Sequence, residues 1–85
     1  MKIFKTNIHG LMIIKFNKNK DNRGTFIESY VKNKYKFLKN IDFIQDNYSI
    51  SKKNVLRGLL YQIKNSQDKL IHITNGKLIN FTVDL

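Results

Sequence analysis

The sequence predicts an all-β protein: a barrel or jelly roll of five to seven short strands with one short helix. From residue 43 onward, short apolar runs such as "FIQDNYSI", "NVLRGLLYQI" and "KLIHIT" are bounded by Asn, Ser, Lys and Asp, which is typical of strands separated by turns. The pair Asn75-Gly76 lies between two alternating segments. It predicts a hairpin, because a type I′ turn needs a positive φ at both central residues. Strands at this spacing, without intervening helices, favour a barrel or jelly roll.

The first half of the chain adds one strand and the helix. Residues 24–30, "GTFIESY", alternate Phe26, Glu28 and Tyr30 against Ile27 and Ser29, with aromatic rings suited to a pleated surface, and predict a strand. The preceding polar stretch 18–24 ends in glycine and predicts a loop. Residues 31–40 place Val31, Tyr35 and Leu38 at helical spacing with lysines between them, so a short helix with a solvated basic face is expected.

Length and composition indicate a single small domain over residues 1–85, with a core that exceeds chain entropy by only a few kcal/mol. A partner is therefore expected. Cysteine is absent, so disulfides and thiolate metal sites contribute nothing. The apolar run Leu11–Ile14 is too short for a signal peptide or a membrane span, which predicts a soluble cytoplasmic protein without membrane contact.

The formal net charge of +10 raises the question of nucleic-acid binding. The basic residues are almost all lysines spread along the whole chain, and only Arg23 and Arg57 are arginines. Arginine is the residue that reads bases and stacks on them. The charge therefore indicates a compositional bias rather than a nucleic-acid partner, although it would not repel a small anionic ligand.

The two histidines give no metal site and no catalytic triad. His9 stands beside a glycine and is expected in a surface turn. His72 alternates with apolar neighbours in a predicted strand, where a structural role is the simpler interpretation, although it could act as a base. Without spaced carboxylates, neither histidine predicts a metal.

A set of polar side chains recurs inside the predicted β segments. Arginines and amides on neighbouring strands are costly to bury unless they are paired or face a ligand. Two interpretations stay open at this point: a polar cavity for an anionic, hydroxyl-bearing ligand, or side chains that face water. The set comprises Arg23, Glu28, Gln45, Asn47, Arg57, Gln62 and Lys69.

Five stretches together carry a resemblance to a known family: "KTNIHGLMII", "DNRGTFIES", "FIQDNYSISKKNVLRGLLYQ", "QDKLIHITNGKL" and "FTVDL". In this order and spacing the sequence resembles the N-terminal half of the dTDP-4-dehydrorhamnose 3,5-epimerase family, which are cupin-type barrels acting on nucleotide sugars. The resemblance implies a partial cupin, with residues 1–85 forming the N-terminal part of one cupin-like domain.

The resemblance also implies roles for individual residues. The reaction it implies removes and returns protons at carbons 3 and 5 of a 4-keto sugar and needs no cofactor. Bidentate guanidinium contacts suit a pyrophosphate, so both arginines stand where such a ligand would need them. The implied nucleotide-binding residues are Arg23, Phe26 and Glu28, the implied sugar and pyrophosphate residues are Gln45, Asn47 and Arg57, and Lys69 would stabilise negative charge on the carbonyl oxygen.

The chain departs from the family pattern at the catalytic base. The family's base is a histidine in "RGLHYQ", and this chain has "RGLLYQ", with Leu60 at that position. Leucine cannot accept a proton, and a positioned base contributes roughly 10²–10⁴ in rate. The family's tyrosine acid and the carboxylate that orients the histidine belong to the C-terminal half, after Leu85. A truncated, catalytically impaired protein is therefore expected, with Leu60 filling the pocket wall.

Two functions from different classes follow, so whether the chain is an enzyme stays open. In the first, the chain is a truncated or degenerate epimerase with little or no catalysis, part of a split gene in one version. In the second, it is a non-catalytic module that binds a nucleotide sugar or pairs with an intact epimerase. Both imply a dTDP-sugar ligand, no metal and no nucleic acid. Open strand edges also predict a homodimer or association with a complementary half.

Overall fold

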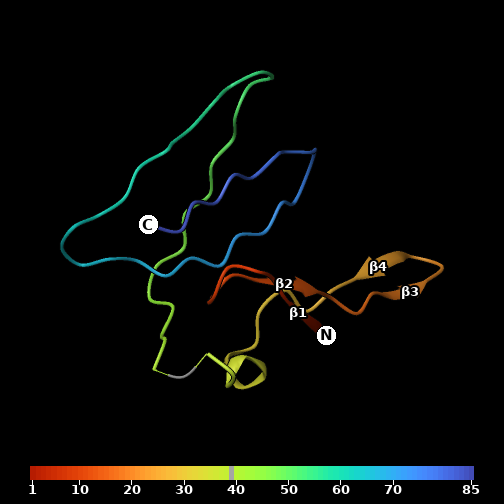
Figure 1. Ribbon diagram of the computed structural model, residues 1–85. Helices are drawn as coiled ribbons and strands as arrows, with labels where there is room; N and C mark the ends of the chain where they lie inside the picture. Colours follow the sequence, from red (N-terminus) through yellow and green to blue (C-terminus); the bar gives the residue numbers. More distant parts are fainter. Residues whose placement is uncertain (39) are drawn as a thin grey trace. The chain divides into compact units, whose positions relative to one another are not determined.

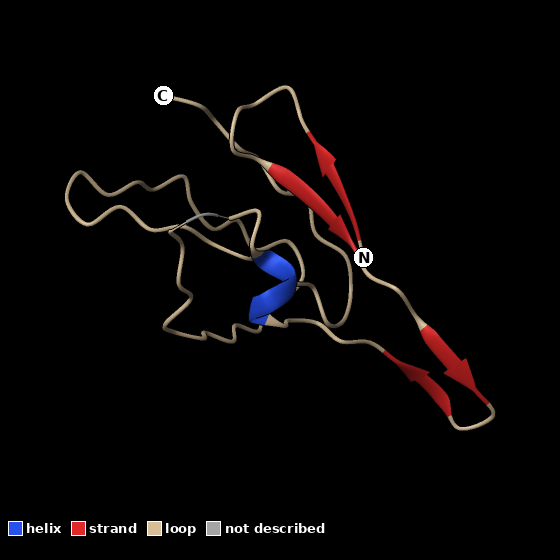
Figure 2. Cartoon of the chain, turned by 90° about the horizontal axis from the view of Figure 1, so that it is seen from below, coloured by secondary structure: helices blue, strands red, loops and turns tan. Residues whose placement is uncertain are grey.

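A computed structural model describes residues 1–38 and 40–85. The chain divides into two units: Met1–Leu38 with Asn80–Leu85, and Lys39–Ile79, in which residue 39 is not described. The regular structure of the described residues consists of two antiparallel hairpins and a single turn of 3-10 helix (Figures 1 and 2). The regular structure is thus almost entirely β, as predicted, and the described strands form no closed barrel, which is consistent with a partial cupin.

The first hairpin joins β1 (Lys2–Lys5) to β2 (Met12–Lys15). Aromatic and β-branched side chains fit the pleated surface of such a pair. The antiparallel register sets Ile3 opposite Ile14, Phe4 opposite Ile13 and Lys2 opposite Lys15. The sequence predicts no strand here, because each strand has only four residues and shows no alternation on its own.

Thr6 closes the loop between β1 and β2. Its hydroxyl donates to the carbonyls of Leu11, at 2.8 Å, and Ile8, at 3.1 Å, and accepts a hydrogen bond from the backbone N–H of Ile8. The backbone N–H of Thr6 also donates to the carbonyl of Leu11. One threonine therefore satisfies several backbone groups of a loop that has no ladder of its own.

The second hairpin pairs β3 (Asn19–Asp21) with β4 (Gly24–Phe26). The strand predicted over residues 24–30 is thus confirmed only in its first three residues. It ends at Phe26 because β3 begins at Asn19, the cross-strand partner of Phe26, and no described strand pairs with residues 27–30. The loop predicted over residues 18–24 is wrong in part, since residues 19–21 form a strand.

The helix predicted over residues 31–40 is a single 3-10 turn, η1 (Lys32–Tyr35), and residue 39 of that prediction lies outside the described part. The apolar face was nevertheless correct. Tyr35 is the buried residue of the described core, with 5% of its surface exposed. Its ring lies 5.0 Å from that of Tyr30 and 5.7 Å from that of Phe37, and the lysines of the turn are exposed.

No strand is described in residues 40–79, so the prediction of an entirely β second half is wrong for this chain. The predicted hairpin at Asn75-Gly76 is a bend: Gly76 has φ 88°, Asn75 has no positive φ, and a type I′ turn needs both. Figure 1 shows the chain reversing direction in this blue segment without paired strands. Alternation specifies strand propensity, whereas a ladder also needs a partner within reach.

Large apolar side chains remain exposed in both units. Ile44, Ile63 and Leu85 are each at least 87% exposed. Both units therefore leave large apolar side chains on their surface.

Among the described helical residues, none belongs to a segment long and apolar enough to cross a membrane.

Candidate functional site

Arg23 occupies the two-residue turn between β3 and β4, together with Asn22. The carboxylate of Asp21, the last residue of β3, accepts hydrogen bonds from both the side chain and the backbone of Arg23. Asp21 Oδ2 accepts from Arg23 Nη2 at 2.6 Å and from Nε at 3.1 Å, and Oδ1 accepts from the Arg23 backbone N–H at 2.8 Å. The guanidinium is 87% exposed, so it is oriented and open to a ligand at the same time.

This pair lowers the pKa of Asp21. The largest cause is the hydrogen bond from the Arg23 side chain, followed by that from the Arg23 backbone N–H, with a smaller contribution from the Gly24 N–H. Each of these donors favours the charged carboxylate. Asp21 therefore stays ionised at neutral pH and Arg23 keeps its acceptor.

Glu28 lies just after β4 and is held by a lysine from η1. Lys34 Nζ lies 2.5 Å from Glu28 Oε2, and both side chains are about half exposed. The two residues line a hollow of about 280 Å³ with Asn17 and Tyr35. The size is close to the lower limit of small-ligand sites, about 300–1,000 Å³. Opposite charges and an amide thus meet at one small concavity.

Tyr35 is the apolar wall of this hollow and also a hydrogen-bond donor. Its hydroxyl donates to the carbonyl of Ser29 at 3.4 Å. Burial raises the pKa of Tyr35 above its usual 10.0, and the neighbouring Tyr30 adds to the increase. The phenol therefore stays protonated and remains a donor at neutral pH.

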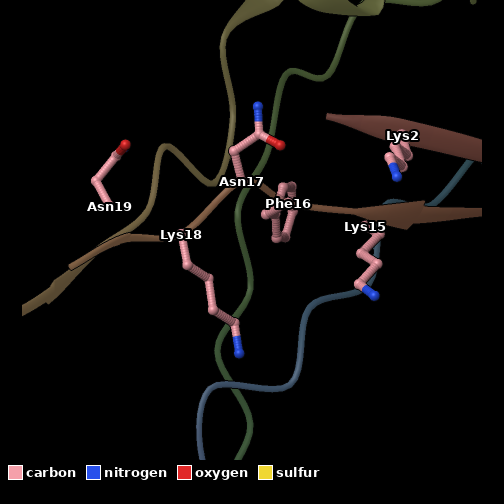
Figure 3. Close-up of a pocket in the computed structure, with 6 residues that line it drawn as sticks. All are labelled: Lys2, Lys15, Phe16, Asn17, Lys18 and Asn19. Carbon is pink, nitrogen blue, oxygen red and sulfur yellow. The ribbon is translucent and has the colours of Figure 1, made fainter.

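A second hollow of about 520 Å³ lies beside the β1–β2 hairpin. Figure 3 shows Lys2 on β1 and Lys15 on β2 along one side, Asn17 and Lys18 along the other, and the Phe16 ring between them. None of the described residues that line it is acidic. Three ammonium groups around one concavity raise the local positive potential and favour anions.

Phe26, the third residue that the resemblance assigns to the nucleotide, lies at the end of β4 with 67% of its surface exposed. An exposed aromatic ring can stack on a base. Arg23, Phe26 and Glu28 thus all lie on or next to the β3–β4 hairpin. No hydrogen bond joins Arg23 to Glu28 among the contacts described for this hairpin.

The second unit carries the predicted sugar and pyrophosphate residues. Gln45 Nε2 donates to Asn47 Oδ1 at 3.0 Å, which two residues on the same side of an extended segment can do. Arg57 Nε donates to Ser51 Oγ at 2.8 Å. The turn at Lys53–Asn54 brings these two together, with Asn54 at φ 65°, a conformation that asparagine tolerates.

The other predicted residues of this unit are exposed. Lys69, Gln62 and His72 all lie at the surface, and Leu60 is 93% exposed. The expectation that Leu60 fills a pocket wall is therefore wrong for this chain, because no described strand packs across residues 55–62 to form such a wall. Within the described residues, no three His, Cys, Asp or Glu side chains are grouped to hold a metal ion.

Four residues that contact the predicted site were missed by the sequence analysis: Asp21, Lys34, Tyr35 as a pocket residue, and Ser51. Asp21 had a signal, since it lies two residues before an arginine in a polar turn, a spacing at which an Asp side chain reaches the backbone N–H. Lys34 and Ser51 had none, because each lies six residues from its partner and local spacing does not pair residues that far apart.

The geometry defines an antiparallel β protein with oriented, exposed guanidinium groups, suited to an anionic ligand. The comparisons with known proteins extend this. The family model described as dTDP-4-dehydrorhamnose 3,5-epimerase matches residues 5–85. The chain belongs to this family.

Curated relatives agree with the family model. The dTDP-4-dehydrorhamnose 3,5-epimerase of Salmonella typhimurium is 40% identical over all of this chain and 48% of its own length, and that of Escherichia coli is 36% identical over the same shares. The Pseudomonas aeruginosa protein of the same name is 43% identical over 76% of this chain and 37% of its own length. The chain thus spans about half the length of these relatives. No solved structure matches it.

Proposed function

We propose that this chain is the nucleotide-sugar-binding part of an epimerase-family protein, with a dTDP-sugar as its ligand. The observation that carries the proposal is the family match over residues 5–85, which includes the hairpin that presents Arg23, Phe26 and Glu28. The relatives are named for action on a dTDP-linked dehydro sugar. Such a ligand combines a base for stacking, a pyrophosphate for arginine and hydroxyls for amides.

In this proposal the roles follow the chemistry of each side chain. Phe26 stacks on the base, Arg23 and Glu28 hold the nucleotide part with it, and Gln45, Asn47 and Arg57 bind the sugar and pyrophosphate. Their support is that both guanidiniums are oriented by an acceptor and remain exposed. Lys69 is exposed on the second unit and supplies a positive charge for the sugar oxygen.

We further propose that the chain is impaired in epimerisation. Proton removal next to a carbonyl needs a base with a suitable pKa, and Leu60 offers none at the position of the family histidine. The same observation favours a second candidate function, a non-catalytic module that binds a nucleotide sugar or pairs with an intact epimerase. Co-elution of this chain with an intact epimerase, in the absence of sugar nucleotide, would favour the second candidate.

Association is part of the proposal. The support is the large exposed apolar surface and the open edges of both hairpins. The partner is a second copy or a complementary half of the same family domain, of which residues 1–85 would be one part. The cytoplasmic location expected from the sequence stays a prediction.

Calorimetry tests the ligand. The protein is expected to bind dTDP in preference to an oligothymidylate of equal charge, and Arg57→Gln is expected to weaken dTDP binding by about tenfold. Lys36→Gln is the matched control, because it removes one positive charge from an exposed lysine that no described hydrogen bond or ion pair joins to Arg23, Glu28 or Arg57. Tight oligonucleotide binding with a steep salt dependence and no dTDP binding would contradict the proposal.

A further inference from the structure

Asp21 engages Arg23 in a way that leaves part of the guanidinium available. Oδ2 accepts hydrogen bonds from both Nε and Nη2, and Oδ1 accepts one from the backbone N–H of the same arginine. A guanidinium has two edges for bidentate contacts, Nε with Nη2 and Nη1 with Nη2. Because Asp21 uses only the first, the second edge remains for an anion.

The turn supports this geometry from the backbone side. Asp21 and Gly24 are cross-strand partners that close the β3–β4 hairpin around residues 22 and 23. Gly24 has φ 139°, which side-chain-bearing residues seldom adopt, and a Cβ there would meet no atom within 4 Å. Asp21 thus belongs to a paired strand, and Arg23 belongs to the turn. Pairing of the strand fixes the position of the Asp21 carboxylate that Arg23 binds.

We propose that Asp21 is a positioning residue for Arg23: it fixes the Nε edge of the guanidinium and directs the Nη1–Nη2 edge to an anionic group of the ligand. The inference deepens the proposed function and rests on it for the identity of the ligand, a pyrophosphate-bearing nucleotide. Holding the arginine in advance reduces the side-chain entropy that a ligand must otherwise overcome.

A positioning role and simple charge repulsion predict opposite effects of Asp21→Asn on the affinity for an anion. If Asp21 were only a nearby negative charge, Asp21→Asn would strengthen the binding of an anion. If Asp21 positions Arg23, the same change weakens it, because a neutral amide holds a guanidinium less well than a carboxylate does. Asp84→Asn removes the same charge from an exposed residue outside the site and serves as the matched control.

The first measurement is ligand-free. Arg23 and Arg57 are the two arginines of the chain, so ¹⁵N NMR of the Nε–H groups gives two signals, and Arg57 is an internal control because Ser51 holds it. Asp21→Asn is expected to shift and broaden the Arg23 signal and to leave that of Arg57 unchanged. Asp21→Glu is expected to restore it in part. Amide signals of the β1–β2 hairpin report whether each variant is folded.

The second measurement is calorimetric titration with inorganic pyrophosphate. Asp21→Asn is expected to bind it about three- to tenfold more weakly than Asp84→Asn. An unchanged Arg23 signal in folded Asp21→Asn, or equal or tighter pyrophosphate binding than in Asp84→Asn, overturns the inference. Failure of the unaltered protein to bind dTDP, together with a changed Arg23 signal, overturns the proposed function and supports the positioning role.

Discussion

Lys34 of η1 and Glu28 after β4 form an ion pair with 2.5 Å between Nζ and Oε2, so the 3-10 turn is tied to the end of the second hairpin. Lys34 therefore holds Glu28, one of the residues that the resemblance assigns to the nucleotide. The sequence places this lysine on a solvated face. Both side chains are about half exposed, which sets the strength of the pair.

Lys34→Met is expected to lower the free energy of unfolding by less than about 1 kcal/mol, because exposed ion pairs are weak and screened. Lys36→Met, which removes the same charge from the neighbouring exposed lysine, is the control. The difference between the variants in urea denaturation is expected to shrink as salt is raised. A difference that persists at high salt would show that Lys34 acts through packing instead.

Tyr35→Ala is expected to cost about 3 kcal/mol, since Tyr35 is the buried residue of the described core. Tyr35→Phe keeps the ring contacts and loses only the long hydrogen bond to Ser29, so it is expected to cost less than about 1 kcal/mol. Urea denaturation of the two variants measures the difference. Equal stabilities for the two variants would mean that the ring cluster adds little.

Tyr35 also gives the unit an alkaline limit. Its pKa in the folded state is raised above 10.0, mainly by burial. Below pH 10 both states are protonated and the stability is intact; above it the unfolded state loses its proton first, so stability falls as pH rises through the folded pKa. Tyr35→Phe is expected to reduce this alkaline loss.

Asp21 gives an acid limit in the opposite direction. Its pKa in the folded state lies below 3.8, because the Arg23 side chain and backbone N–H favour the carboxylate. The stabilisation is present above pH 3.8 and is lost as pH falls through the folded value. Carboxyl ¹³C NMR is expected to show this low pKa, and Arg23→Gln is expected to return it only part of the way, since the backbone N–H remains. A full return would mean that the backbone contact has no effect.

The sequence was sufficient for features that depend on neighbours along the chain. The β class, the apolar face containing Tyr35 and the turn character of residues 22–23 all follow from local spacing. The family also followed, because five motifs in order are specific even where each is weak. Asp21 could have been found by the same local reasoning.

Features that depend on a distant partner could not be predicted. The apolar runs at residues 43–50 and 54–63 are typical of strands, yet no ladder forms among the described residues, because hydrogen bonds between strands need a second strand that local sequence does not specify. The β1–β2 hairpin could not be predicted either. Its two strands have only four residues each, too few to show alternation, and they are strands because they pair with each other. Leu60 is exposed because no described strand pairs with its segment.

Leu60 lies at the position where the resemblance places the catalytic base. Incubation of the protein with dTDP-4-keto-6-deoxyglucose in deuterated water is expected to give no deuterium at carbons 3 and 5 above the uncatalysed rate, because leucine accepts no proton and a positioned base contributes roughly 10²–10⁴ in rate. Proton NMR measures the signal loss at both carbons.

In a protein of residues 1–85 only, Leu60→His is expected not to restore exchange, since the resemblance assigns the tyrosine acid and the orienting carboxylate to positions outside this segment. Leu59→His, one position away, is the matched control for a non-specific histidine effect. Exchange in Leu60→His but not in Leu59→His would show that a base at position 60 suffices and that the rest of the machinery is already in place. Exchange by the unaltered chain would show that another group has become the base, and His72 would be the first to replace with glutamine.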